Sequence, residues 1–162
     1  MRHSARPARG VHFCLLLALA TTASAFAQGP STTRGQLLYV PVYSEIPYGN
    51  RNRTIPLAAT LSIRNIDPTH PIEVRRVDYY DAQGQRVAPY LIGPQRLEPL
   101  ASMQLVVKES DKTGGVSSSF LVEWASSEAV SPPIVEAVMV STASSQGISF
   151  LGDARILRET PP

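Results

Sequence analysis

Cysteine is nearly absent from this chain of 162 residues, because Cys14 is the single one. It lies in "VHFCLLLALATTA", an apolar run near the N-terminus, so the rest of the chain carries no thiol. Disulfides, thiol catalysis and sulfur-ligated metal sites are therefore excluded beyond that run. Histidine is also scarce. Only His70 follows the run, which excludes a metal site built from several histidines.

Residues 1–27 have the organisation of a secretory signal peptide. Basic "MRHSARPARG" precedes the apolar run, and Ala25–Ala27 fits the small-x-small cleavage pattern. The run is too short to span a bilayer comfortably, and no later stretch resembles a membrane span. We therefore predict cleavage near Ala27, a mature chain that begins near Gln28, and a periplasmic or secreted location.

Removing that segment changes the charge balance of the protein. The segment contains three arginines and no acidic residue, so the mature chain would have 12 Lys and Arg and 13 Asp and Glu, a formal net charge of −1. No stretch interleaves basic and aromatic residues. Nucleic acid and anionic membrane surfaces are therefore not expected as partners. No motif indicates a cofactor or a metal ion.

Fourteen prolines and ten glycines divide the chain into short apolar segments. These segments alternate with a period of two rather than a helical period, as Leu57, Ala59, Leu61 and Ile63 do. Strands are predicted at 36–44, 55–65, 72–80, 86–92, 96–107, 119–125, 134–142 and 148–157.

Seven or eight such strands predict an all-β fold, an antiparallel immunoglobulin-like β-sandwich without a disulfide, with a small barrel as the alternative. The expected organisation is a flexible segment over 28–35, one sandwich domain over 36–157 and a flexible tail over 158–162. Pro41 lacks an amide proton, so its strand should lie at an edge or bulge there. A switch of apolar parity predicts a second bulge at Arg75–Arg76.

Two glutamates, Glu123 in "FLVEWA" and Glu136 in "IVEAVMV", are the sharpest candidates for chemistry. If these strands form a hairpin, the register that gathers their apolar residues on one face places the two glutamates opposite each other, about 5 Å apart. Such carboxylates repel. An arginine between them would make a structural ion network. The alternatives are a divalent-cation site, or an acid pair of a glycoside hydrolase. The candidate arginines are Arg64, Arg75, Arg76 and Arg155.

Loop order suggests a second candidate site. In an up-and-down run of strands every second connection falls at the same end, so "IPYGNRNRT", "DAQGQ", "KESDKTGG" and "ASSQG" should cluster. The cluster would carry Tyr48, Arg51, Arg53, Lys112 and Gln146. Sandwich domains often bind through such loops, although a plain polar end fits the same residues.

Serine and His70 supply no recognisable catalytic motif. "ASSQG" lacks the Gly-x-Ser-x-Gly pattern and the helix of a nucleophile elbow, so it is interpreted as a turn between strands. His70 lies in "DPTHP", and no spacing selects a serine to act with it. We interpret it as an exposed turn histidine.

Five segments together resemble a known family: "LLYVPVYSEIPYG", "LSIRN", "VDYYDAQG", "FLVEW" and "VEAVMVSTASSQGISF". They are similar, in this order, to exported bacterial proteins catalogued as domain of unknown function 3124. The resemblance implies an extracytoplasmic bacterial protein of about this size, and it implies no activity, cofactor or functional residue. The arginine-rich loop "IPYGNRNRT" and the lack of an assembled catalytic motif favour a non-catalytic binding or assembly module of the bacterial envelope, whose partner could be an envelope protein, a glycan or its own copy. A carboxylate-based hydrolase or cation site at Glu123 and Glu136 is the alternative.

Overall fold

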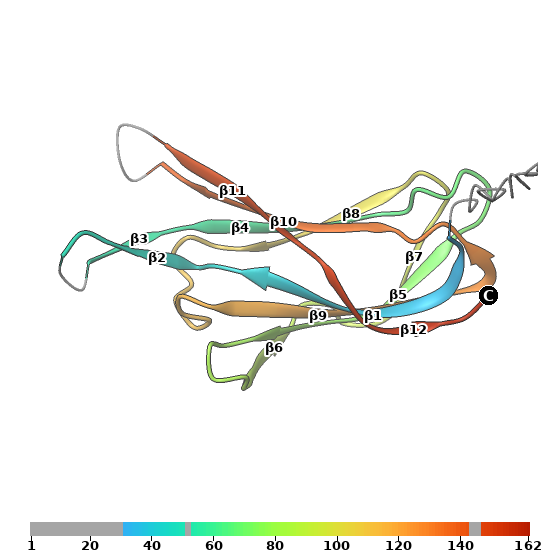
Figure 1. The fold of residues 1–162 in the computed structure, drawn as a ribbon, viewed down its shortest axis with the longest axis horizontal. Coiled ribbons are helices and arrows are strands. Elements are labelled where there is room, and N and C mark those ends of the chain that lie inside the picture. The colour runs from blue at the N-terminus through green and yellow to red at the C-terminus, as the bar shows by residue number, and fades with distance from the viewer. Residues whose placement is uncertain (1–30, 51–52, 143–146) are drawn as a thin grey trace, which may run out of the picture.

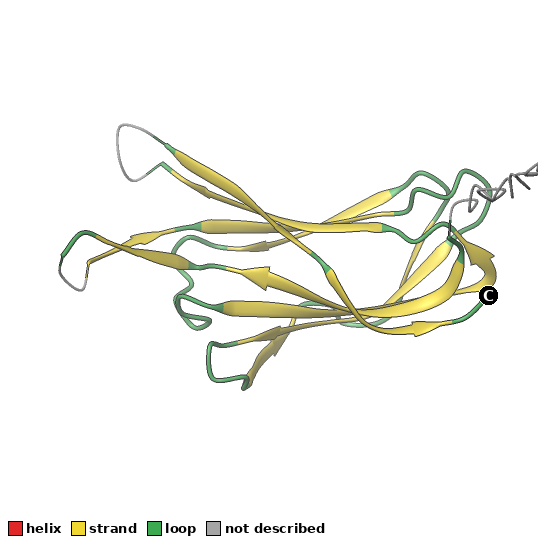
Figure 2. Ribbon diagram, in the orientation of Figure 1, coloured by secondary structure: helices red, strands yellow, loops and turns green. Residues whose placement is uncertain are grey.

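The computed structural model describes residues 31–50, 53–142 and 147–162. Within these ranges the chain is all-β, with twelve antiparallel strands and no helix (Figure 2). The strands are β1 (Thr33–Val42), β2 (Glu45–Tyr48), β3 (Arg53–Pro56), β4 (Ala58–Arg64), β5 (Ile72–Tyr80), β6 (Arg86–Pro89), β7 (Gln95–Leu97), β8 (Ser102–Val107), β9 (Ser118–Val130), β10 (Ile134–Ser141), β11 (Ile148–Asp153) and β12 (Arg155–Thr160). No helix in this part of the chain is long and apolar enough to cross a membrane.

Two sheets form the layers of a sandwich (Figure 1). The larger sheet has the order β12-β1-β9-β5-β6, with β7 also paired to β5, and the smaller sheet has the order β11-β10-β4-β8. Strands β2 and β3 form a separate hairpin that projects from one end. The chain passes from the smaller to the larger sheet between β11 and β12. The predicted antiparallel sandwich is therefore confirmed, and the two sheets do not close into a barrel.

The core lies between the sheets and follows the alternation of the sequence. Leu57, Ala59, Leu61 and Ile63, predicted to share a face, are all fully buried. The larger sheet contributes Trp124, Tyr79 and Phe120, and the smaller sheet contributes Met139. Because successive side chains of a strand point to opposite faces, a period of two is sufficient to place these residues inside.

The number of strands differs from the prediction of seven or eight, for local reasons. The segment 96–107 divides into β7 and β8 at Pro99 and Leu100, where Leu100 has a φ of 62° and the amide of Ala101 donates to the carbonyl of Glu98 (3.0 Å). The segment 148–157 divides at Ala154, where the chain changes sheet. The loop predicted between 46 and 54 forms the β2–β3 hairpin instead.

Both predicted domain boundaries fall inside strands. Residues 33–35 belong to β1, and residues 158–160 belong to β12. These two segments pair with each other, with Gly35 opposite Thr160, and the Thr33 hydroxyl donates to the Thr160 carbonyl. Backbone pairing between the two ends of the domain thus extends the sheet past residues 36 and 157.

The pairing of neighbouring strands tests the two predicted departures from regular strand structure, at Arg75–Arg76 and at Pro41. The register between β5 and β9 shifts between Val74 and Arg76, so the bulge at Arg75–Arg76 is confirmed. Strand β1 lies inside the larger sheet, but its pairing with β12 ends at Tyr39. The prediction of an edge strand is therefore wrong for β1, and no bulge falls at Pro41. Because β12 does not extend as far as Pro41, the missing N–H leaves no carbonyl of β12 unpaired.

Candidate functional site

The strand ends that flank the four connections predicted to cluster lie at the same end of the sandwich (Figure 1). We call this the loop end; it is where β2, β5, β8 and β10 finish and β3, β6, β9 and β11 begin. Two hydrogen bonds tie its parts together. The Ala82 amide donates to the Gly114 carbonyl (3.2 Å), and the Ser44 hydroxyl donates to the Gly115 carbonyl (2.7 Å).

Of the predicted binding residues, the structure brings Tyr48 and Arg53 together. They are opposite each other in the β2–β3 hairpin, with the guanidinium carbon 4.8 Å from the centre of the tyrosine ring. A cation–π contact of this kind at an exposed position is worth about 0.5–1 kcal/mol. Lys112 is exposed in the separate β8–β9 connection. Arg51 and Gln146 lie outside the described residues.

Beneath the loop end, an aromatic cluster holds the strand ends in place. Tyr79 packs against Tyr90 and Phe120, with ring centres 5.5 and 5.0 Å away. The Tyr79 hydroxyl donates to Ser118 (3.0 Å), whose own hydroxyl donates to the Val42 carbonyl (3.1 Å). Burial raises the pKa of Tyr79, and it raises the pKa of Tyr90 to about 12. Both phenols therefore stay protonated at neutral pH, and their role is to support the loops.

The predicted pairing of Glu123 with Glu136 is wrong. Strands β9 and β10 do not form a hairpin; β9 lies between β1 and β5 in the larger sheet, and β10 lies between β11 and β4 in the smaller sheet. Glu123 is opposite Leu37 and Arg76, whereas Glu136 is opposite Ser62 and Asp153. The apolar residues of both strands point into the core, so the two glutamates lie on opposite outer faces of the sandwich.

The predicted arginine partners are present, one for each glutamate. Arg64 contacts Glu136 at 3.0 Å, and Arg76 contacts Glu123 at 3.1 Å. On the larger sheet the contacts continue into a row that crosses the strands. Its members alternate in charge, with arginine–carboxylate distances of 2.7–3.5 Å: Arg158, Glu123, Arg76, Asp78 and Arg86. Asp78 is only 2% exposed. Both candidate carboxylates are thus members of structural ion pairs and cannot act on one bond.

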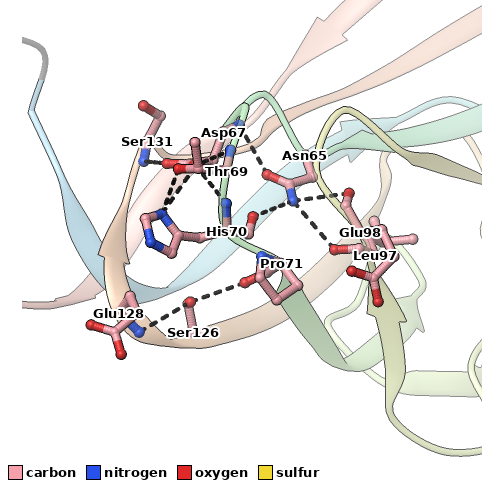
Figure 3. A network of polar contacts seen from close by, with 10 residues as sticks. All are labelled: Asn65, Asp67, Thr69, His70, Pro71, Leu97, Glu98, Ser126, Glu128 and Ser131. Atoms are coloured by element: carbon pink, nitrogen blue, oxygen red, sulfur yellow. Dashed lines mark hydrogen bonds and ion pairs between the residues drawn. The ribbon is translucent and has the colours of Figure 1, made fainter.

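The opposite end of the sandwich is closed by a polar network around Asn65 and Asp67 (Figure 3). The Asn65 amide group donates to the carbonyls of His70 (2.9 Å), Leu97 (3.2 Å) and Glu98 (3.1 Å), and its oxygen accepts the Asp67 amide (3.0 Å). The β4–β5 and β7–β8 connections are tied to one buried side chain in this way.

The Asp67 carboxylate completes the network. It accepts backbone N–H groups from Thr69 (2.9 Å), His70 (2.9 Å) and Ser131 (3.1 Å). These backbone hydrogen bonds, with Thr69 first, hold the pKa of Asp67 well below its usual range. The carboxylate is therefore ionised at any physiological pH and acts as an anchor for the turn.

His70 lies beside this carboxylate but is not part of a catalytic triad. Its Nδ1 atom is 3.3 Å from Asp67 and 2.8 Å from the Thr69 hydroxyl, and its side chain is half exposed. Of the two serines drawn in Figure 3, Ser126 donates its hydroxyl to the Pro71 carbonyl (3.0 Å), and Ser131 donates its backbone N–H to Asp67. Within the described residues no serine hydroxyl is bonded to the ring. The interpretation of His70 as a turn residue therefore agrees with its contacts.

The family model for "Protein of unknown function (DUF3124)" matches residues 35–157. The chain belongs to this family. No curated protein matches it. Among solved structures, the chain is similar to "Crystal Structure of Thermotoga maritima 1070", with 14% identity, a TM-score of 0.38, and coverage of 80% of this chain and 95% of that chain.

The sequence of this DUF3124 member did not predict one surface feature, a pocket of about 300 Å³ beside the polar network. Its size is at the lower limit for small-molecule sites. The two arginines in it are each paired with a glutamate, Arg75 with Glu73 at 3.2 Å and Arg96 with Glu98 at 2.7 Å. The pocket is lined by Pro71, Ile72, Glu73, Arg75, Arg96, Ala125, Ser126 and Ser127. Because the residues that line this pocket come from strands far apart in the chain, no local sequence pattern predicts it.

Proposed function

We propose that this DUF3124 protein is exported through a cleaved signal peptide and acts as a non-catalytic binding or assembly module of the bacterial envelope. Its partner would be an envelope protein or a glycan, bound at the loop end. The main support is the Tyr48–Arg53 pair, which is exposed on a hairpin that projects beyond the sandwich.

The architecture of the loop end favours binding. Loops held by a rigid scaffold commonly carry recognition residues, and tyrosine and arginine are enriched at binding hot spots. The contact with the ring restricts the Arg53 side chain before a partner arrives, which reduces the conformational entropy that it would lose on binding. A carboxylate-based reaction is not proposed, because Glu123 and Glu136 lie on opposite faces.

Export is tested directly. The full chain is expressed in a bacterial host, cells are fractionated, and the N-terminus of the recovered protein is sequenced. We expect the protein in the periplasm or medium, beginning near Gln28. A product that stays in the cytoplasm with residues 1–27 attached would contradict this part of the proposal.

Binding is tested with the mature chain from residue 28 immobilised on beads. Envelope extract and purified cell-wall glycan are offered to the wild type, to the Tyr48→Ala, Arg53→Ala double variant, and to an Arg96→Ala control at the opposite end. The loop-end variant should lose the captured partner, and the control should keep it. Equal capture by all three proteins would mean that the loop end is not the binding surface.

A further inference from the structure

Strand β12 is an unusually open edge of the larger sheet. All six of its residues are exposed, and it pairs with β1 alone. The edge strand β8 of the other sheet, by comparison, still buries Met103 and Val107. No other described strand pairs with the far edge of β12, so that edge offers backbone N–H and C=O groups to an added strand.

Apolar side chains are exposed along this edge. Ile156 and Leu157 are each 57% exposed. Ile156 lies opposite Leu38, a buried core residue, so it faces the core side of the sheet. Leu157 occupies the shift in register between β1 and β12. An added strand would cover the Ile156 side chain.

The outer side of the same edge carries excess positive charge. Arg155 lies opposite Tyr39 and Arg158 lies opposite Leu37, which places both arginines on the outer face. Arg155 has no ion pair within the described part of the chain. Arg158 reaches Glu123 at 3.5 Å but shares that carboxylate with Arg76.

We propose that β12 binds an extended acidic peptide segment of a partner protein by strand addition. Side chains of an added strand alternate between the two faces. Carboxylates at every second position would face Arg155 and Arg158, and the apolar residues between them would pack against Ile156. A second copy of this chain is a poor occupant, because two β12 strands would bring the arginines of both copies together. The surface is separate from the loop end, so either proposal can fail without the other.

The experiment uses two labelled peptides with the mature chain. One alternates Glu with Val over nine residues, and the other has Lys in place of each Glu. Fluorescence anisotropy at low ionic strength should give a dissociation constant at least tenfold lower for the acidic peptide, and salt should weaken its binding. Amide hydrogen exchange should slow at β12 when the acidic peptide is added.

Charge reversal supplies the matched variants. The Arg155→Glu, Arg158→Glu double variant should lose the acidic peptide by tenfold or more and gain the lysine peptide. Arg96→Glu, an exposed arginine on β7 of the same sheet, should leave both affinities unchanged. Thermal unfolding checks that each variant is folded, and Arg155→Glu alone serves if the double variant is not.

Three results would overturn the proposal. The first is equal affinity for the two peptides, or no binding of either at millimolar concentration. The second is binding of the acidic peptide that survives charge reversal at β12. The third is a dimer in sedimentation velocity whose β12 amides are protected without any peptide, because the occupant would then be a second copy.

Discussion

Replacing Trp124 with alanine tests whether the two sheets pack as described. Trp124 is 1% exposed, the largest fully buried side chain among the described residues, and its ring N–H donates to the Gln36 oxygen at 3.3 Å. Truncating a buried tryptophan costs about 3–5 kcal/mol. Gln36 is itself 5% exposed, and losing its donor adds to that cost.

The magnitude is large against the stability of a single domain, about 5–15 kcal/mol. With a urea dependence near 2 kcal/mol per molar, a loss of about 4 kcal/mol moves the unfolding midpoint down by roughly 2 M. Far-ultraviolet dichroism is the suitable signal, since Trp124 is the only tryptophan and its fluorescence would be lost with it. Trp124→Phe should cost less, because the phenyl ring fills much of the same space.

Tyr39→Ala is the control, an aromatic residue on the neighbouring strand that is 38% exposed. We expect a change within about 1 kcal/mol there. If Trp124→Ala costs no more than Tyr39→Ala, the indole does not lie between the sheets, and the packing described above is wrong.

Three further changes are expected to have defined effects. Glu123→Gln and Glu136→Gln should each lower the free energy of unfolding by about 0–1 kcal/mol, measured in urea. Because the two residues lie on separate faces, the losses should add within about 0.5 kcal/mol in the double variant. A Glu136→Gln variant more stable than wild type would favour an unrelieved carboxylate pair. The pKa of Asp67 is lowered in the folded state, so the stabilisation that its carboxylate gives is present above about pH 4 and is lost as the pH falls towards the lowered value. The difference in melting temperature between wild type and Asp67→Asn should therefore become smaller in acid. A difference that stays constant with pH would argue against an ionised carboxylate at this position. Gly114→Ala should destabilise by about 2 kcal/mol in urea unfolding, because a Cβ there would collide with the Tyr79 hydroxyl; no change would mean that the β8–β9 connection packs differently.

Alternation in the sequence was sufficient to predict the layers but not which strands are neighbours. The apolar residues of β9 and β10 face each other across the core, and a hairpin would have placed them on one face as well. Both arrangements satisfy the same pattern. Pro132 and Pro133, which lack amide donors, direct the chain out of the larger sheet after Val130. These two prolines were the sequence feature that argued against a hairpin between β9 and β10.

Loop position was predictable because it follows from strand direction alone. The polar network was not, since Asn65 and Asp67 take partners up to 64 residues away, such as Ser131. The sequence there predicts only a turn. The exposure of β12 was not predicted either, because residues 148–157 were expected to form a single strand, whereas the chain divides them between β11 and β12.

The most direct test of the account is the distance between positions 123 and 136. Spin labels attached to the mature chain after Glu123→Cys and Glu136→Cys substitution would report it by double electron–electron resonance, with no other cysteine after Cys14 to interfere. Sheets stacked about 10 Å apart, with both labels pointing outward, predict a separation of roughly 20 Å or more. Strong dipolar coupling, as expected for opposed residues about 5 Å apart, would place the two glutamates in one site and contradict the account.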